Sequence, residues 1–198
     1  MDSNRKTAII VGALILIAYG VIGSLFLESS IIAMLLELIS GAAIVGMAVL
    51  MFPILKPHNK NLTFGYAAIK IIDGVLIGVA AIMILSSSTL LLEVRDLIYV
   101  NSTYLFCTGF LILSYLFYQS KLVPRFISVW GVIASILLLS STLINMMAAG
   151  TVILTDSTVI PFTVSHLPVI SNELFLAVWL IVKGFNTSAI ASGSTKTV

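Results

Sequence analysis

The chain has 198 residues, of which 60% are hydrophobic and only 9% are charged, and its mean hydropathy is +1.18. Soluble domains usually carry charge on about a quarter of their residues, so this composition excludes a water-exposed globular protein and indicates a chain whose main solvent is lipid. The net charge of +2 is small and the basic residues are spread along the chain, which excludes a nucleic-acid-binding surface.

Six apolar runs are long enough to cross a bilayer as helices. The first follows a basic start and exceeds the hydrophobic region of a signal peptide, so it is interpreted as a retained span. Pro53 and Pro57 are expected to end the second, and the fourth can extend backwards through Tyr99. The expected spans cover residues 7–27, 31–52, 63–85, 103–118, 126–148 and 165–185. The sequence therefore predicts an all-α membrane protein, with one six-transmembrane-helix domain over 1–185 and a disordered tail over 186–198.

The basic residues in the connections predict how the bundle is oriented, because connections rich in Lys and Arg stay in the cytoplasm. With the N-terminus inside, the external connections hold only Arg95. The cytoplasmic segments then hold Arg5, Lys6, Lys56, Lys60, Lys121, Arg125, Lys183 and Lys196. Both termini are therefore predicted to be cytoplasmic.

Two external connections are longer than simple turns. The stretch "LLLEVRDLIYV" (90–100) has apolar residues at helical spacing and charged residues on the other face, which predicts a short amphipathic helix on the outer leaflet. The stretch "TVILTDSTVIPFTV" (151–164) is rich in β-branched residues and broken by Asp156 and Ser157, which predicts a small outer hairpin. Pro161 weakens one of its strands.

Small residues recur at four-residue spacing in several spans, which lets helix backbones approach closely. We interpret this spacing as packing within one chain rather than as dimerisation. The pairs are Ala8/Gly12, Ala42/Gly46 and Gly74/Gly78.

Four ionisable residues lie inside the expected spans, where a charge is costly enough to be kept away from lipid. Lys70 and Asp73 are three residues apart, so they share a helix face and can pair. Glu37 and Glu173 lie on other spans at a depth similar to that of Asp73, by the helical rise per residue. If these faces converge, the four residues and Asn172, which adjoins Glu173, form one ligand- or ion-binding site.

The candidate site holds three acids and one base, and bare carboxylates in a low dielectric are prohibitive. The extra acids could be protonated, bind a cation or a cationic ligand, be hydrated through an outward-open cavity, or be reached by Arg95 from the surface. Each of these possibilities except the last implies that the site binds or transfers protons, ions or a ligand. Buried charges also serve as interhelical glue. The Lys70–Asp73 pair alone fits either a structural or a functional role, whereas the surplus of acids favours a functional role for the site.

Other chemistry finds little support in the sequence. The single cysteine, Cys107, excludes an intrachain disulfide and a thiolate metal cage. His58 and His166 fall on opposite sides of the membrane, so they cannot share a metal. The tyrosines are interpreted as interface belts and packing. No metal, cofactor or catalytic residue is predicted, and an enzyme is less expected than a binding protein.

Three stretches resemble a known family. They are "GAAIVGMAVLMFPILKPHNKNLTFGYAAIKIIDGVLI", "SKLVPRFISVWGVIA" and "NELFLAVWLIVKGFN", and together they resemble the prokaryotic membrane proteins catalogued as domain of unknown function 4386. The resemblance extends over nearly the whole chain. It implies a six-span protein in the cytoplasmic (inner) membrane of a bacterium or archaeon, and it implies no activity.

Three functions remain open at this point. The first is a small-molecule or lipid-binding protein that uses the acid-rich site, with a proton- or cation-linked transporter as its narrower form. The second is a structural or accessory subunit in which the buried charges are glue. The third is a lipid-modifying membrane enzyme with paired acids as general acid and base. The expected partners are membrane lipids and a small-molecule or cationic ligand, whereas the sequence predicts no oligomeric state.

Overall fold

A computed structural model describes residues 3–24, 27–149 and 162–194. All regular structure within these residues is helical, and six segments among them are long and apolar enough to cross a membrane, α1 and α2 together forming the first. The predicted all-α fold with six candidate membrane helices is thereby confirmed. The helices are α1 (Ser3–Ala18), α2 (Gly20–Ser24), α3 (Ser30–Leu55), α4 (Lys60–Met83), α5 (Thr89–Ser120), α6 (Arg125–Ala149), α7 (Phe162–Val182) and α8 (Thr187–Ser194).

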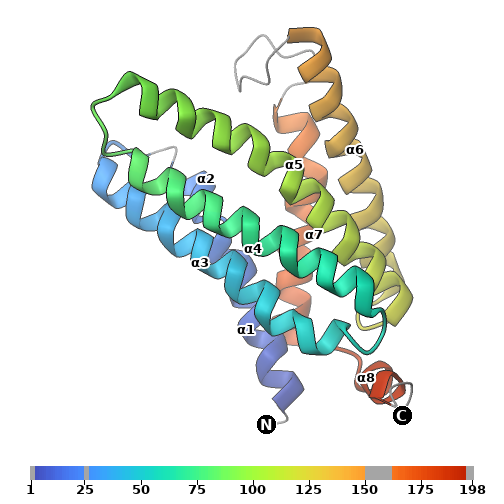
Figure 1. The fold of residues 1–198 in the computed structure, drawn as a ribbon. Coiled ribbons are helices and arrows are strands. Elements are labelled where there is room, and N and C mark those ends of the chain that lie inside the picture. The colour runs from blue at the N-terminus through green and yellow to red at the C-terminus, as the bar shows by residue number, and fades with distance from the viewer. Residues whose placement is uncertain (1–2, 25–26, 150–161, 195–198) are drawn as a thin grey trace.

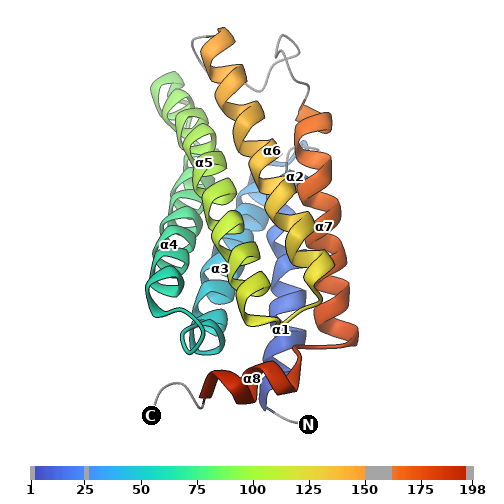
Figure 2. The same ribbon diagram turned by 90° about the vertical axis from the view of Figure 1, so that its right-hand side faces the viewer.

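The long helices form a closed ring. Each packs on the next in the order α1, α3, α4, α5, α6 and α7, and α7 returns to α1. Large buried side chains such as Met51, Phe110 and Phe117 fill the interior. Helix α8 lies across one end of the bundle (Figures 1 and 2). This ring brings faces of α1, α4, α5 and α7 toward a common interior.

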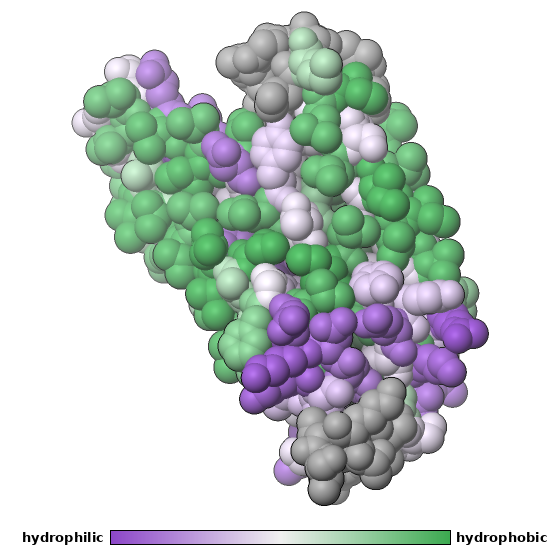
Figure 3. All heavy atoms as spheres, turned by 45° about the vertical axis from the view of Figure 1, so that its right-hand side comes forward, coloured by the Kyte–Doolittle hydropathy of each residue, from purple (hydrophilic) through white to green (hydrophobic). Residues whose placement is uncertain are grey.

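The outward faces of the ring are apolar, as a lipid environment requires. Ile72 of α4, Ile133 of α6 and Val178 of α7 are each more than half exposed. Hydrophobic side chains cover most of the surface in Figure 3, and hydrophilic ones gather in a band at one end. These faces suit a multi-pass membrane protein.

The chain termini and α8 lie at the same end of the bundle (Figure 1), which we call the basic end. It is formed by the start of α1, the α3–α4 and α5–α6 connections and the end of α7. The described basic residues at these positions are Arg5, Lys6, Lys56, Lys60, Lys121, Arg125 and Lys183. That this end faces the cytoplasm remains a prediction from the charge pattern.

The amphipathic segment 90–100 is helical as predicted, but it is not a separate surface helix. It forms the first turns of α5, which continues without a break to Ser120. No proline or glycine lies between Thr89 and Thr108, so the sequence offers no point at which the helix would stop. The predicted surface helix and the fourth span are therefore one element.

Other boundaries also differ from expectation. Helix α3 runs through Pro53 to Leu55, because a proline near a helix end removes only one hydrogen bond of the ladder. The tail predicted to be disordered is helical over α8, and the Asn186 Oδ1 accepts a hydrogen bond from the Ser188 backbone N–H as an N-cap does. Most of the predicted hairpin lies outside the described residues, and 162–164 begin α7.

Helices α3 and α4 meet backbone to backbone at two glycines. A Cβ atom added at Gly41 would lie 2.6 Å from the Gly74 carbonyl oxygen, and one added at Gly74 would lie 2.6 Å from the Gly41 carbonyl oxygen. Nothing lies within 4 Å of a Cβ added at Gly78, one turn further along α4. The close approach places α4, and with it Lys70 and Asp73, against the bundle interior.

Replacing Gly74 by Ala should lower the free energy of unfolding by about 1–3 kcal/mol, because the added methyl group overpacks against backbone. Gly78→Ala on the same helix should be neutral or stabilising by up to about 1 kcal/mol, since alanine is the better helix former. Unfolding in mild detergent micelles measures both. Equal effects of the two variants would contradict the contact.

Candidate functional site

The five predicted site residues are all buried, but they separate into different surroundings. Glu37, Lys70, Asp73 and Asn172 are at most 2% exposed, and Glu173 is 8% exposed. Glu37 lies in one polar cluster, Lys70, Asp73 and Glu173 in another, and Asn172 contacts the backbone of α6.

The Glu37 cluster consists of Ser24, Glu37, Arg95 and Tyr99 and joins α2, α3 and α5. The Glu37 Oε1 accepts a hydrogen bond of 2.7 Å from the Arg95 Nη2 and one of 2.9 Å from the Ser24 hydroxyl. A short, charge-assisted bond of this kind is among the strong ones in proteins. The Arg95 guanidinium carbon also lies 4.8 Å from the centroid of the Tyr99 ring. Arg95 therefore reaches inward and neutralises Glu37, which was one of the alternatives considered for the extra acids.

The Lys70 cluster consists of Tyr19, Tyr66, Lys70, Asp73, Ser102 and Glu173. Its cation, the Lys70 Nζ, lies 3.7 Å from the Asp73 Oδ2 and 4.6 Å from the centroid of the Phe106 ring of α5. The ion pair is long for a hydrogen bond between charged groups, which is usually 2.7–2.9 Å. Gly109 makes room for the lysine, since a Cβ atom there would lie 3.3 Å from the Lys70 Cε.

The third charged group of the Lys70 cluster comes from α7. The Glu173 Oε2 accepts a hydrogen bond of 2.8 Å from the Tyr19 hydroxyl. Glu173 also lies within range of electrostatic interaction with both Lys70 and Asp73. Within the described part of the chain, no ion pair shorter than 4.0 Å joins Glu173 to a cation. Glu173 is therefore held by a neutral donor and shares the charge of Lys70 with Asp73.

The position of Tyr19 depends on a break between α1 and α2. The Ser40 hydroxyl of α3 donates to the Ile17 carbonyl at 3.3 Å and to the Leu36 carbonyl at 2.7 Å. Gly20 lies against this hydroxyl, where a Cβ atom would be 2.6 Å from the Ser40 Oγ. A side chain that inserts beside a helix ladder is a usual cause of a kink. The break leaves Tyr19 between the two helices, with its hydroxyl on Glu173.

Both clusters hold buried polar atoms that make no hydrogen bond of ordinary length and angle within the described residues, although such atoms are nearly always hydrogen-bonded in folded proteins. Around Lys70 they are the two Asp73 carboxylate oxygens and the hydroxyls of Tyr66 and Ser102. Around Glu37 they are Glu37 Oε2, Arg95 Nε and the Tyr99 hydroxyl. The described residues therefore satisfy these atoms only through longer contacts, such as the 3.7 Å approach of the Lys70 Nζ to the Asp73 Oδ2.

Asn172 has a different role from its neighbour Glu173. Its Nδ2 donates a hydrogen bond of 3.0 Å to the Ile127 carbonyl of α6. A Cβ atom at Gly131, one turn further on, would come within 3.1 Å of the Asn172 Oδ1. The amide therefore connects α7 to the backbone of α6, and this contact depends on the absence of a side chain at Gly131.

Sequence reasoning assigned Tyr19 and Tyr66 to interface belts and packing, whereas the structure places both in the Lys70 cluster. Tyr66 precedes Lys70 by four residues, so the helical repeat already put the two on one face of α4. For Tyr19 the only signal was the adjacent Gly20. Within the described residues, no group of three His, Cys, Asp or Glu side chains is arranged to hold a metal ion.

Comparison with known proteins gives one match. A family model described as "Domain of unknown function (DUF4386)" matches residues 28–184, which is more than half of the chain and includes both clusters except Tyr19 and Ser24. No curated protein and no solved structure matches the chain.

Proposed function

The chain belongs to the DUF4386 family of uncharacterised domains, and we propose that it binds a proton or a small cation in the Lys70 cluster and uses it to bind or carry a small solute. The proposed location is the cytoplasmic membrane. The observation that carries the proposal is Glu173, the one buried carboxylate among the described residues that has no cation of its own.

The charges of the two clusters support this reading. Glu37 is paired with Arg95, and Asp73 is paired with Lys70. With Glu173 ionised, the Lys70 cluster would hold a net charge of −1 in a low-dielectric interior, which costs far more than a neutral arrangement. A proton or a small cation removes this excess.

The polar groups of the Lys70 cluster favour a polar occupant. The Asp73 carboxylate, which the Lys70 Nζ approaches only to 3.7 Å, and the hydroxyls of Tyr66 and Ser102 are groups that can coordinate a small cation or hydrogen-bond a polar solute. In Figure 3, hydrophilic side chains also appear among the hydrophobic ones away from the band at the basic end.

The test compares the thermal stability of the purified protein in sodium, potassium and choline chloride at equal ionic strength, and across pH. An occupant that binds only the folded state stabilises it, by about 1.4 kcal/mol at ten times its dissociation constant. We expect wild type to respond to one small cation or to pH, and Glu173→Gln to lose that response while it stays folded. Native mass spectrometry from mild detergent reports any retained solute.

Glu93→Gln is the matched control, because Glu93 is an exposed acid of α5. It should keep the full response of the wild-type protein. If wild type and Glu173→Gln give the same profiles in every salt and at every pH, the proposal is wrong.

A structural or accessory subunit is the second candidate, and a specific observation favours it. The Glu37–Arg95 pair joins α3 to α5, and the Asn172 amide joins α7 to α6, as interhelical glue does. This candidate predicts that a protein partner co-purifies in fixed ratio, and that Glu173→Gln changes stability without changing any ion response.

A further inference from the structure

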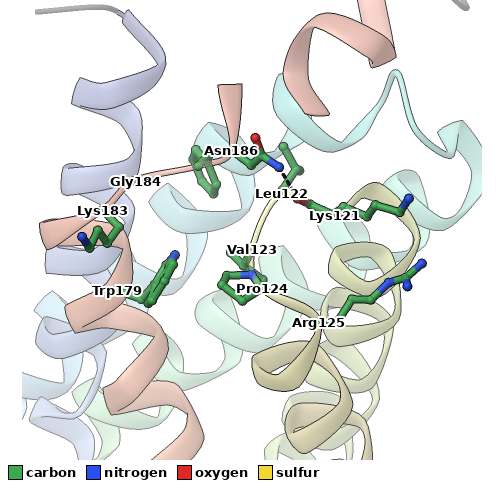
Figure 4. Close-up of a pocket in the computed structure, with 10 residues that line it drawn as sticks. Lys121, Leu122, Val123, Pro124, Arg125, Trp179, Lys183, Gly184 and Asn186 are labelled. Carbon is green, nitrogen blue, oxygen red and sulfur yellow. Dashed lines mark hydrogen bonds between the residues drawn. The ribbon is translucent and has the colours of Figure 1, made fainter. Parts of the chain in front are cut away.

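A pocket of about 480 Å³ opens at the basic end of the bundle. It lies between the α5–α6 connection and the end of α7, and Figure 4 shows Lys121 and Arg125 on one side of it and Lys183 on the other. Its remaining lining is largely apolar and is formed by Leu122, Val123, Pro124, Trp179, Gly184, Phe185 and Asn186. The three cationic residues are exposed and flank a mostly buried apolar floor, with their charged ends pointing away from it in Figure 4.

None of the acids that the structure describes lies beside the positive charge around this pocket. Within the described residues, no ion pair involves Lys121, Arg125 or Lys183, and the acids lie inside the bundle or toward its opposite end. Helix α6 begins at Arg125, so the positive end of its dipole adds to the field.

The negative, C-terminal end of the α7 dipole is neutralised by Arg5 of α1. The Arg5 guanidinium donates hydrogen bonds to the carbonyls of Leu180, Ile181 and Val182, at 3.1, 2.7 and 2.9 Å. These are carbonyls of the last turn of α7, which otherwise carry its partial negative charge. With Arg5 on them, the field at the pocket stays positive.

The walls of the pocket are fixed to each other. The Asn186 backbone N–H donates to the Leu122 carbonyl at 2.9 Å, and its Nδ2 donates to the Lys121 carbonyl at 3.3 Å. Gly184 turns the chain with a φ of +77°, a conformation that favours glycine. These contacts fix the backbone of the site, which lowers the cost of binding a ligand there.

We propose that this pocket binds the phosphate-bearing headgroup of an anionic phospholipid. The pocket lies where the membrane helices end, which is the level of the headgroups. Basic pockets between membrane helices are suited to such headgroups, and an indole at this level suits an amphipathic neighbour. The apolar floor accepts the glycerol end and the first acyl carbons, and the volume is that of a small-molecule site. In Figure 4 the charged ends of Lys121, Arg125 and Lys183 point away from the pocket, and these exposed side chains would turn toward its mouth when they meet the phosphate.

The test measures binding of short-chain phosphatidylglycerol to the full chain in neutral detergent, with short-chain phosphatidylcholine and inorganic phosphate as separate titrants. We expect phosphatidylglycerol to bind most tightly. Lys121→Gln/Arg125→Gln/Lys183→Gln should weaken it by about a hundredfold, since each cation near anionic lipid contributes roughly fivefold. Lys56→Gln/Lys60→Gln, at the same end but outside the pocket, should stay within about twofold.

Three results would overturn the proposal. The triple variant could bind phosphatidylglycerol as wild type does, the control pair could lose as much affinity as the triple variant, or inorganic phosphate could bind as tightly as the lipid, which would make this a free-phosphate site. If the triple variant does not fold, Lys183→Gln alone decides, because its side chain is exposed. It should lose about fivefold in affinity, and an unchanged affinity would count against the site.

Discussion

Replacing Arg95 by Leu is expected to lower the free energy of unfolding by about 3–5 kcal/mol, because the change removes one partner of a buried ion pair and leaves the other uncompensated. Glu37 is 1% exposed and would keep only neutral groups beside it, the hydroxyls of Ser24 and Tyr99. Neutral polar contacts in membrane helices average only about 0.6 kcal/mol, so a loss of this size distinguishes an orphaned charge from an ordinary lost contact. Unfolding from mild detergent micelles measures it.

Two further variants separate the ion pair from the surface charge beside it. Asp96→Ala removes an acid whose side chain is 79% exposed and lies 3.9 Å from the Arg95 Nη1, so it should change stability by no more than about 0.5 kcal/mol. Glu37→Leu/Arg95→Leu removes both buried charges and should recover most of the loss. A single Arg95→Leu variant as stable as wild type would show that the pair does not hold α3 and α5 together.

Replacing Lys70 by Met is expected to be comparably destabilising, about 3–5 kcal/mol, because this lysine is the one cation in contact range of Asp73 within the described residues. The change keeps the apolar stem against Phe106 and removes only the charge. Asp73 and Glu173 would then be two buried acids without a base. Unfolding in micelles measures the loss.

The double variant Lys70→Met/Asp73→Asn tests which group of the cluster matters. It removes one positive and one negative charge, so Glu173 keeps its excess and the double variant should recover part of the stability. It should also keep the response to small cations or pH that depends on Glu173. A double variant that stays folded but loses this response would assign it to the Lys70–Asp73 pair instead.

The six-helix architecture could be predicted from the sequence because lipid imposes a simple rule, namely long apolar runs with basic residues at one end. The rule does not predict where a helix is interrupted or where two expected helices are continuous. It could not show that α1 ends at Ala18, because the break depends on the Ser40 hydroxyl of a neighbouring helix. It also split α5 at its charged residues, although Arg95 turns inward rather than to the lipid headgroups.

The candidate site was predictable in its residues but not in its grouping. Depth along each helix placed the three acids at one level, yet the direction in which each side chain points depends on how the helices rotate about their axes. Glu37 faces α5 and Arg95, whereas Glu173 faces Tyr19 and the α4 pair. Helix rotation is set by packing contacts such as Gly41 on Gly74, which a single sequence does not reveal.

The most direct test of the central claim is infrared difference spectroscopy of the carboxyl groups, recorded when choline is exchanged for a small cation and when the pH is changed. If Glu173 binds the proton or cation, wild type should show a carboxyl signal in at least one of the two difference spectra. Glu173→Gln should lack that signal, and Glu93→Gln should retain it. Wild-type and Glu173→Gln spectra that coincide in both experiments would contradict the account.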